Sequence, residues 1–249
     1  MKDNPTLKIQ ECGQSLWYDN LNRELIVSGE LQRLIDEYGI VGITSNPTIF
    51  ERAVSGSPDY DVSLQDLLKK EPHGSIERLY EKLVIRDIQS AADMLHPVYD
   101  NTKFKDGYVS IEVSPDLAYD REGTIAEAKR LFAEINRPNI MIKVPATKEG
   151  MEAVQILIAE GININVTLMF SVQDYLDAAE AYLSGLEKLD QAGGDLTKVT
   201  SVASFFVSRI DTAVDNLLPK DAALLGKIAV ANAKIAYSQF QNPLSQSIA

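Results

Sequence analysis

Short apolar runs alternate with longer stretches of helical periodicity along most of the chain. Apolar runs bounded by turn residues are typical of strands, whereas apolar positions recurring every three or four residues are typical of amphipathic helices. The alternation of the two is typical of a parallel sheet. It predicts strands at residues 15–19, 41–45, 108–113, 140–144, 163–170 and 199–205. It predicts helices at residues 22–38, 63–68, 75–95, 121–136, 148–160, 172–189, 206–217 and 221–240.

Helix ends carry the usual signals. Asn20 and Asp120 precede predicted helices, Ser75 opens one, and Gly39 and Gly161 follow helices. The long segment 47–106, between the second and third strands, is interpreted as a helical insertion and not as a second domain. The sequence therefore predicts a single domain, residues 1–249, with no repeat beyond the strand–helix alternation.

Polar side chains alternate with apolar ones inside three of the predicted strands. They are residues 110, 112 and 114 in one strand, Lys143 in the next, and residues 163, 165 and 167 in the third. Because strand side chains alternate between faces, each strand has one apolar and one polar face. Helices would cover the apolar face, so the polar face must point into an enclosed space. An open doubly wound sheet is usually apolar on both faces, so the pattern favours an α/β fold of the TIM-type (β/α) barrel class.

The strand count falls short of a closed barrel. Six strands are predicted, whereas about eight are needed, and only nine residues follow Phe240. The chain is therefore expected to be C-terminally truncated, with six of eight strands present. Two missing strands would leave open sheet edges, so a chain of this length is expected to be poorly stable, prone to aggregation or weakly active.

Charge and composition narrow the classes of function. The chain has 24 Lys and Arg against 36 Asp and Glu, a net charge of -12, which disfavours nucleic acid or an anionic membrane as the main partner. The sequence has no membrane-spanning run, no secretory signal and one cysteine, and we expect a cytoplasmic protein. Cys12 is expected to be a small buried apolar residue near the first strand. His73 and His96 are given no catalytic or metal-binding role, and no residue cluster suggests a metal.

Lys143 is an unusual residue inside an apolar strand. A lysine there must keep its ammonium group in water, pair it with an acid, or lose its charge. Taken alone, the first arrangement, with a solvated tip and a buried stem, is the commoner one. The third arrangement makes a nucleophile toward carbonyl groups.

Other polar residues gather at the carboxyl ends of the same strands, where barrel active sites form. They are Asp19, Thr44, Ser45, Asn46, Glu112, Asn165, Thr167 and Ser204. One lysine, two carboxylates, amides and hydroxyls suit covalent imine catalysis on a polyhydroxylated substrate. Single members have simpler explanations: Asp19 could cap a helix, Asn46 could be a turn residue, and Glu112 could balance Lys143 as an ion pair.

Four segments, in this order and spacing, resemble signatures of the transaldolase family. They are Gly42-Ile-Thr-Ser-Asn-Pro-Thr-Ile49, Ile140-Met-Ile-Lys-Val-Pro-Ala-Thr-Lys-Glu-Gly150, Asn163-Ile-Asn-Val-Thr-Leu-Met-Phe-Ser171 and Ala203-Ser-Phe-Phe-Val-Ser-Arg-Ile-Asp211. The resemblance covers about residues 10 to 240. It implies transfer of a dihydroxyacetone unit from sedoheptulose 7-phosphate to glyceraldehyde 3-phosphate, and the reverse, in the non-oxidative pentose phosphate pathway.

The resemblance also implies roles for individual residues. Lys143 would form a Schiff base with the ketose, and Asp19 would take the proton of the C4 hydroxyl as the C3–C4 bond breaks. Glu112, through a water held by Thr167, would move protons during imine formation. Asn46, Asn165 and Ser204 would hold the hydroxyl groups of the dihydroxyacetone unit, and Arg209 would bind the phosphate. Thr44 and Ser45, beside Asn46, are further candidates for substrate binding. Arg209 taken alone would be an ordinary helix surface charge.

No cofactor or metal is implied, because the protonated imine is itself the electron sink. The expected partners are small sugar phosphates, with no nucleic acid and no membrane, and a homodimer is left open. Two alternatives remain. One is a fructose-6-phosphate-type aldolase that releases free dihydroxyacetone, and the other is an inactive remnant of such an enzyme.

Overall fold

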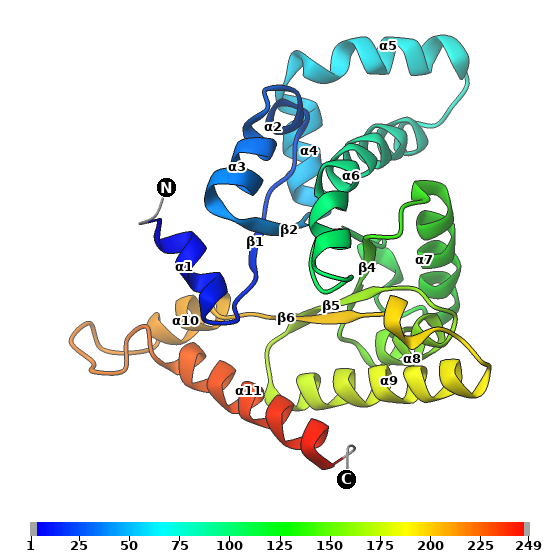
Figure 1. The fold of residues 1–249 in the computed structure, drawn as a ribbon. Coiled ribbons are helices and arrows are strands. Elements are labelled where there is room, and N and C mark those ends of the chain that lie inside the picture. Colours follow the sequence, from blue (N-terminus) through cyan, green and yellow to red (C-terminus); the bar gives the residue numbers. More distant parts are fainter. Residues whose placement is uncertain (1–3, 247–249) are drawn as a thin grey trace. The chain divides into compact units, whose positions relative to one another are not determined.

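The computed structural model describes residues 4–246, and the chain folds into two compact units (Figure 1). The first unit comprises the chain up to Val113 together with Glu127–Ile142. The second comprises Ser114–Ala126 and the chain from Lys143 onward. Helix α7 (Arg121–Ile135) and strand β4 (Ile140–Pro145) each contribute residues to both units.

The first unit contains strands β1 (Leu16–Tyr18), β2 (Ile40–Thr44), β3 (Tyr108–Glu112) and the first half of β4. Its helices are α1 (Pro5–Glu11), α2 (Arg23–Val27), α3 (Glu30–Tyr38), α4 (Pro47–Gly56), the 3-10 turn η1 (Pro58–Tyr60), α5 (Asp61–Lys70), α6 (Ile76–Asn101) and the second half of α7. The predicted insertion after the second strand is therefore present as α4, η1, α5 and α6.

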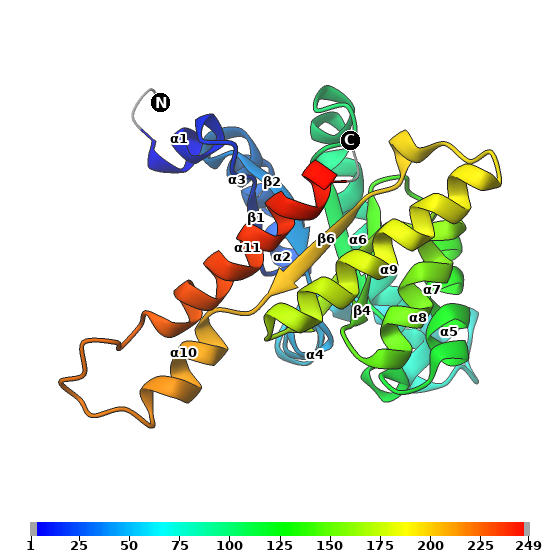
Figure 2. The same ribbon diagram turned by 90° about the horizontal axis from the view of Figure 1, so that it is seen from below.

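The second unit contains the rest of β4, β5 (Ile164–Met169) and β6 (Ser201–Phe205). Its helices are η2 (Pro115–Leu117), the start of α7, α8 (Lys148–Ala159), α9 (Val172–Gln191), η3 (Leu196–Lys198), α10 (Ser208–Asp215) and α11 (Ile228–Gln246). Helix α11 contacts both α9 and α10, and a long loop joins α10 to α11 (Figure 2).

Strands follow sequence order within each unit, β1-β2-β3-β4 in the first and β4-β5-β6 in the second. The pairings of β1 with β2, β2 with β3, and β5 with β6 are all parallel. All six predicted strands are present within residues 4–246, each followed by helical structure. The predicted fold class, α/β with the strand–helix order of a (β/α) barrel, is confirmed.

Helix α6 supplies much of the core of the first unit. It contacts β2 and β3 and buries a stripe that includes Leu83, Ile88 and Leu95. In the second unit α8 and α9 pack closely because a small residue lies between them. A Cβ atom at Gly185 would lie 2.7 Å from the Ile158 side chain. Burial of each leucine or isoleucine contributes roughly 1.5–3 kcal/mol, so these packed helix faces stabilise the unit to which each belongs.

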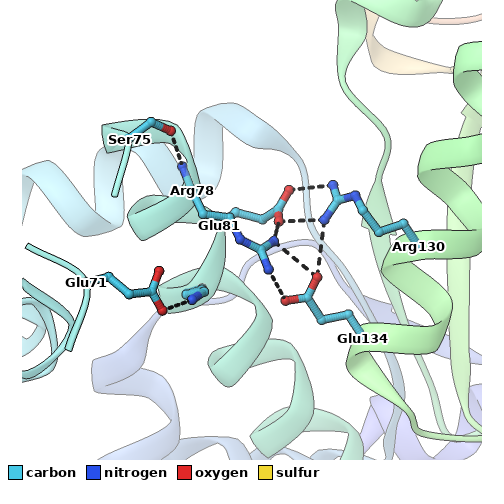
Figure 3. Close-up of polar contacts among 7 residues, drawn as sticks. Glu71, Ser75, Arg78, Glu81, Arg130 and Glu134 are labelled. Carbon is cyan, nitrogen blue, oxygen red and sulfur yellow. Dashed lines mark hydrogen bonds and ion pairs between the residues drawn. The ribbon is translucent and has the colours of Figure 1, made fainter. Parts of the chain in front are cut away.

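A ring of ion pairs joins α6 to α7 in the first unit (Figure 3). The two guanidinium nitrogens of Arg130 donate to the two carboxylate oxygens of Glu81, each at 2.7 Å. Arg78 donates to Glu81 at 2.6 Å and to Glu134 at 2.8 Å. Burial raises the pKa of the Glu81 carboxyl, but the adjoining Arg130 and Arg78 guanidinium groups outweigh this and lower it overall.

The predicted helix at 22–38 is wrong as a single element, because it is divided into α2 and α3. Gly29 lies between them at φ 80°, a left-handed conformation that ends one helix and reorients the next. The cap of α2 is also different from the predicted one. The side chain of Asn22, not Asn20, accepts a hydrogen bond from the Leu25 N–H at 2.8 Å.

Three further expectations need correction. Helices α1 and α4 were not predicted, since Asn4-Pro5 and Asn46-Pro47 were not interpreted as helix starts. Helix α11 begins at Ile228 and not at 221. Cys12 is exposed and not buried, because it follows the last residue of α1 instead of preceding a buried strand.

The predicted ends at other helices are confirmed. Ser75 caps α6, and the Asp120 carboxylate accepts a hydrogen bond from the Gly123 N–H at 3.0 Å in the first turn of α7. Gly39 and Gly161 have φ of 68° and 84° after α3 and α8. Within residues 4–246, every helix is too short or too polar to span a bilayer.

Candidate active site

In the first unit, the predicted site residues follow the carboxyl ends of three adjacent parallel strands. Tyr18 is in register with Ile43, and Thr44 is in register with Ser110. Asp19 therefore follows β1, and Glu112 ends β3, at the same edge of the sheet as Thr44. The structure thus brings the two carboxylates and the end of β2 to one edge, as the sequence predicts.

Asp19 has no helix-capping role. The N-cap of α2 is Asn22, and Asp19 lies exposed between the end of β1 and that cap. The alternative explanation of Asp19 as a helix cap is therefore wrong. Asp19 is placed on a strand end with its side chain available for chemistry.

Ser45 and Asn46 have structural contacts of their own. The Ser45 hydroxyl, fully buried, donates a hydrogen bond of 2.7 Å to the carbonyl oxygen of Ser110 and so ties β2 to β3. The Oδ1 atom of Asn46 accepts a hydrogen bond of 3.1 Å from the Ile49 N–H and caps α4. Asn46 is thus a helix cap, which fixes its amide group at the strand end.

In the second unit, Lys143 lies inside β4 with only 6% of its surface exposed, between Ile142 and Val144, which are fully buried. A solvated lysine tip would expose far more surface, so the commoner arrangement of a strand lysine does not apply here. A lysine buried to this degree is rare, because its ammonium group must then be paired or lose its charge.

Asn165 and Thr167 on β5 are also buried, at 1% and 2% exposure. The hydroxyl of Ser204, on β6, donates a hydrogen bond of 2.7 Å to the Oδ1 atom of Asn165. Asn163, at the other end of the polar row, accepts a hydrogen bond from the Thr200 N–H at 2.9 Å. The pair of Asn165 and Ser204 is therefore brought together by the strand pairing, whereas Asn163 fastens the loop before β6.

Strand β5 contains a bulge directly after Thr167. From Val166 to Met169 the strand advances three residues while its partner advances two, from Ala203 to Phe205. Leu168 is the extra residue, with φ 62° and 38% exposure between buried neighbours. A leucine in the left-handed region costs about 1–2 kcal/mol, and bulges are frequent beside active sites. The alternating sequence gave no sign of this irregularity.

The main chain holds the end of this bulge in place. The Ala146 N–H donates a hydrogen bond of 2.8 Å to the Thr167 carbonyl oxygen, which links the end of β4 to β5. After β5, the Asp174 carboxylate accepts hydrogen bonds from the N–H groups of Phe170 and Ser171, each at 2.9 Å. Burial raises the pKa of Asp174, but these hydrogen bonds outweigh burial and lower it overall.

The turn after β4 depends on a glycine in the lysine segment. The Thr147 hydroxyl accepts a hydrogen bond of 3.0 Å from the Gly150 N–H and caps α8. A Cβ atom at Gly150 would lie 2.1 Å from the Pro145 carbonyl oxygen. Only glycine therefore lets α8 begin this close to the strand that carries Lys143.

Arg209 lies exposed in the first turn of α10. Its guanidinium group lies 4.5 Å from the centre of the Phe206 ring, and Phe206 stacks on Phe170 with ring centres 5.2 Å apart. An arginine above an aromatic ring is held by a cation–π interaction. Sequence reasoning missed both phenylalanines, although each directly follows a strand with polar site residues.

Carboxylate, imidazole and thiolate groups do not gather in a way that suits a metal. No cluster of three or more such side chains occurs in the part of the chain that the structure describes. His96 lies against the Tyr99 ring and 3.5 Å from Asp100 on α6, which is ordinary helix surface packing.

Residues 16–247 match the model of a family described as transaldolase/fructose-6-phosphate aldolase. This match covers every strand and every predicted site residue. The chain belongs to this family. The segment around Lys143 therefore lies within the matched region, as do both carboxylates.

Curated relatives agree with the family match. The chain is 48% identical over 254 residues to a transaldolase of Trichodesmium erythraeum, covering 97% of this chain and 66% of that protein. It is 47% identical over 255 residues to transaldolase 2 of Nostoc punctiforme, with the same coverage of both chains. It is 46% identical over 242 residues to a transaldolase of Thiobacillus denitrificans, covering 95% of this chain and 67% of that protein. The chain thus spans about two thirds of the length of these relatives.

Proposed function

We propose that the protein is a transaldolase that moves a dihydroxyacetone unit between sugar phosphates. The donor is sedoheptulose 7-phosphate, the acceptor is glyceraldehyde 3-phosphate, and the products are erythrose 4-phosphate and fructose 6-phosphate. The observation that carries this proposal is a lysine with 6% exposure inside a parallel strand of a family member. The names of the relatives, which are called transaldolase, support the same reaction.

In this proposal the Lys143 amine attacks the C2 carbonyl of the ketose, and water is lost to leave a protonated imine. Asp19 takes the proton of the C4 hydroxyl, the C3–C4 bond breaks, and its electron pair moves toward the imine nitrogen to give an enamine. The aldehyde leaves, and the enamine carbon then attacks the carbonyl of the acceptor. Asp19 returns its proton to the new hydroxyl, and water releases the product and restores the lysine.

The remaining residues bind substrate and move protons. Glu112 shuttles protons through a water held by Thr167 while the imine forms and hydrolyses. Asn165 and Ser204, joined by their hydrogen bond, hold hydroxyl groups of the dihydroxyacetone unit, with Thr44 and Asn46 at the end of β2. Ser45, predicted to bind substrate, is fully buried and instead holds this strand end in place through its hydrogen bond to Ser110. Arg209 binds the substrate phosphate as a planar guanidinium donor.

The same proposal places the protein in the cytoplasm and in the non-oxidative pentose phosphate pathway. In that pathway such transfers connect sugar phosphates of different length. A homodimer is compatible with it. Sugar phosphates are the proposed partners, since Arg209 supplies the local cation that an anionic substrate needs.

The second candidate is an aldolase that releases dihydroxyacetone to water. The description of the matching family names both activities. The two activities differ in whether product formation requires an acceptor. A transaldolase converts fructose 6-phosphate only when an aldose phosphate is present, whereas the aldolase releases free dihydroxyacetone without one.

Trapping the imine tests the proposal. The protein is incubated with fructose 6-phosphate, reduced with borohydride and digested, and the adduct is mapped by mass spectrometry. We expect the adduct on Lys143, no adduct in Lys143→Arg, and an unchanged adduct in the control Lys148→Arg, since Lys148 is an exposed lysine five residues further on. An adduct on another lysine, or none in the unaltered protein, rejects the proposal.

A further inference from the structure

A hollow of about 380 Å³ lies in the first unit, between α2 and α6 and beside the residues that follow α7. Its polar lining includes three arginines, Arg23, Arg86 and Arg137, and two aspartates, Asp87 and Asp93. The lining therefore carries a net charge of about +1 in a chain whose net charge is -12. None of these residues has a part in the proposed reaction.

Arg23 contributes a partly buried guanidinium group to this wall. Its Nε atom donates to the Oδ1 atom of Asp87, its Nη1 atom donates to the Ser63 hydroxyl at 3.0 Å, and the group lies over the Tyr60 ring. Its Nη2 atom is buried and has no acceptor. The second oxygen of Asp87 accepts from the Tyr60 hydroxyl at 2.8 Å. Arg23 thus has one donor nitrogen left over, which is shielded from solvent in the folded state.

The other two arginines differ from each other. Arg137 is engaged, since its Nε and Nη2 atoms donate to the two carboxylate oxygens of Asp93, at 2.5 and 3.0 Å. Arg86 is exposed, and its guanidinium group has no ion pair among the described residues. The hollow therefore combines two guanidinium groups held by aspartates, those of Arg23 and Arg137, with one uncompensated cation, Arg86, on its rim.

Arg23 also lines a second hollow of about 130 Å³, with Arg52, Glu24 and Asp59. Two arginines and two carboxylates there give a balanced lining, and the volume is too small for a metabolite. Ligand pockets usually have volumes of roughly 300–1,000 Å³, so only the larger hollow has both the size and the charge for a small anion.

We propose that the hollow between α2 and α6 binds the phosphoryl group of a small molecule, with the exposed Arg86 guanidinium as the donor and the neighbouring Arg23 guanidinium as a second positive group in the wall. The planar arginine fork matches phosphate oxygens in two-point contacts, which an isolated ammonium group does not. Occupancy would neutralise the Arg86 charge, so it would stabilise the folded first unit by mass action.

Binding is measured in the full chain carrying Arg209→Gln. This substitution removes the phosphate-binding residue of the proposed active site, so that any phosphate binding measured belongs to the hollow. Inorganic phosphate and glycerol 3-phosphate are titrated by calorimetry, and the melting temperature is followed in parallel. Sodium chloride at matched ionic strength and glycerol are the blanks. We expect both phosphates to bind and to raise the melting temperature, whereas neither blank does. Tighter binding of the ester identifies a phosphorylated metabolite as the ligand, and equal binding identifies free phosphate.

Arg86→Gln is the decisive variant, because an exposed side chain can be changed without disturbing the buried Arg23–Asp87 pair. We expect it to weaken phosphate binding about tenfold or more, the loss of one charged hydrogen-bonding partner. The control Arg33→Gln changes an exposed arginine outside the hollow and should leave the affinity unchanged. Equal affinities in the two variants, no binding in the Arg209→Gln background, or an equal response to chloride would each overturn the proposal.

Discussion

The Ser204 hydroxyl donates a hydrogen bond of 2.7 Å to the Oδ1 atom of Asn165 across two neighbouring parallel strands. Because the amide oxygen of Asn165 accepts this hydrogen bond, its amide nitrogen, which is a donor, points away from Ser204. Ser204 therefore has an orienting role as well as the direct contact proposed for it. Both residues belong to segments whose resemblance to transaldolases was evident from the sequence.

Ser204→Ala is expected to lower kcat/KM for the ketose donor by about fivefold, the value of one neutral hydrogen bond of roughly 1 kcal/mol. Ser201→Ala, at the start of the same strand, is the control and should retain full activity. Steady-state kinetics with fructose 6-phosphate and erythrose 4-phosphate measure the effect. Full activity in Ser204→Ala, or an equal loss in both variants, would contradict the proposed orientation.

The left-handed conformation of Leu168 in the bulge predicts an unusual order of stability among variants at this position. Alanine at this position loses apolar burial and keeps the left-handed strain, whereas glycine relieves the strain, so Leu168→Gly should be more stable than Leu168→Ala by about 1 kcal/mol. In a regular strand the order is reversed. Ala203→Gly, opposite Val166 on β6, should cost about 0.5–1 kcal/mol and is the control. Urea denaturation measures the free energy of unfolding of all three variants. If Leu168→Gly were less stable than Leu168→Ala, backbone strain at this position would be ruled out as the cause.

Much of the fold could be predicted because strands and helices have different periods. The polar face of Asn165 and Thr167 identified a strand with one enclosed side, and both residues are buried in the structure. The break between α2 and α3 was missed because Gly29 is one residue within a longer amphipathic pattern. Helix α4 was missed because Asn46-Pro47 is equally typical of a turn and of a helix start, and only the hydrogen bond to Ile49 decides.

The candidate site was predicted less completely. Strands and their ends could be located from the sequence, so the positions of Asp19, Glu112 and Lys143 in or directly after β1, β3 and β4 were predicted correctly. The contacts of each side chain could not, because they depend on strand register. The Ser45 bond to Ser110 and the stacking of Phe206 with Phe170 both require knowing which residues face each other. The Leu168 bulge leaves no trace in the alternation at all.

The ion-pair ring between α6 and α7 should show measurable coupling. Glu81 and Arg130 are joined by two parallel hydrogen bonds and their side chains are only 25% and 42% exposed. A double-mutant cycle of Glu81→Gln and Arg130→Gln should give a coupling energy of about 0.5–1 kcal/mol, falling as salt is added. The control pair Asp66 and Lys69 on α5 is more exposed and should give almost none. Equal coupling in the two pairs would mean that the ring adds nothing.

Asp174 should make the second unit sensitive to acid. Its pKa is lowered in the folded state, because the Phe170 and Ser171 N–H groups outweigh the effect of burial. The stability it contributes is fully present above its unfolded-state pKa of about 3.9 and is lost as the pH falls through the lower folded-state value. Asp174→Ala should therefore cost about 1 kcal/mol at pH 7 and progressively less below pH 4.

Urea denaturation of Asp174→Ala at several pH values provides the measurement. Asp177→Ala, one turn further along α9, is the control and should show no comparable loss. A cost for Asp174→Ala that stays constant from pH 7 to pH 2.5 would mean that the negative charge is not the source of the stability.

The single tryptophan of the chain, Trp17, lies where β1 pairs with β2. Trp17 is in register with Gly42, and its indole ring lies where a side chain at that position would be, with the nearest ring atom 2.3 Å from an added Cβ. Separation of β1 from β2 would expose the ring to water. Intrinsic fluorescence therefore offers a label-free optical reporter of the pairing beside Asp19, and comparison with far-ultraviolet circular dichroism would reveal whether this strand pair melts before the remainder of the chain.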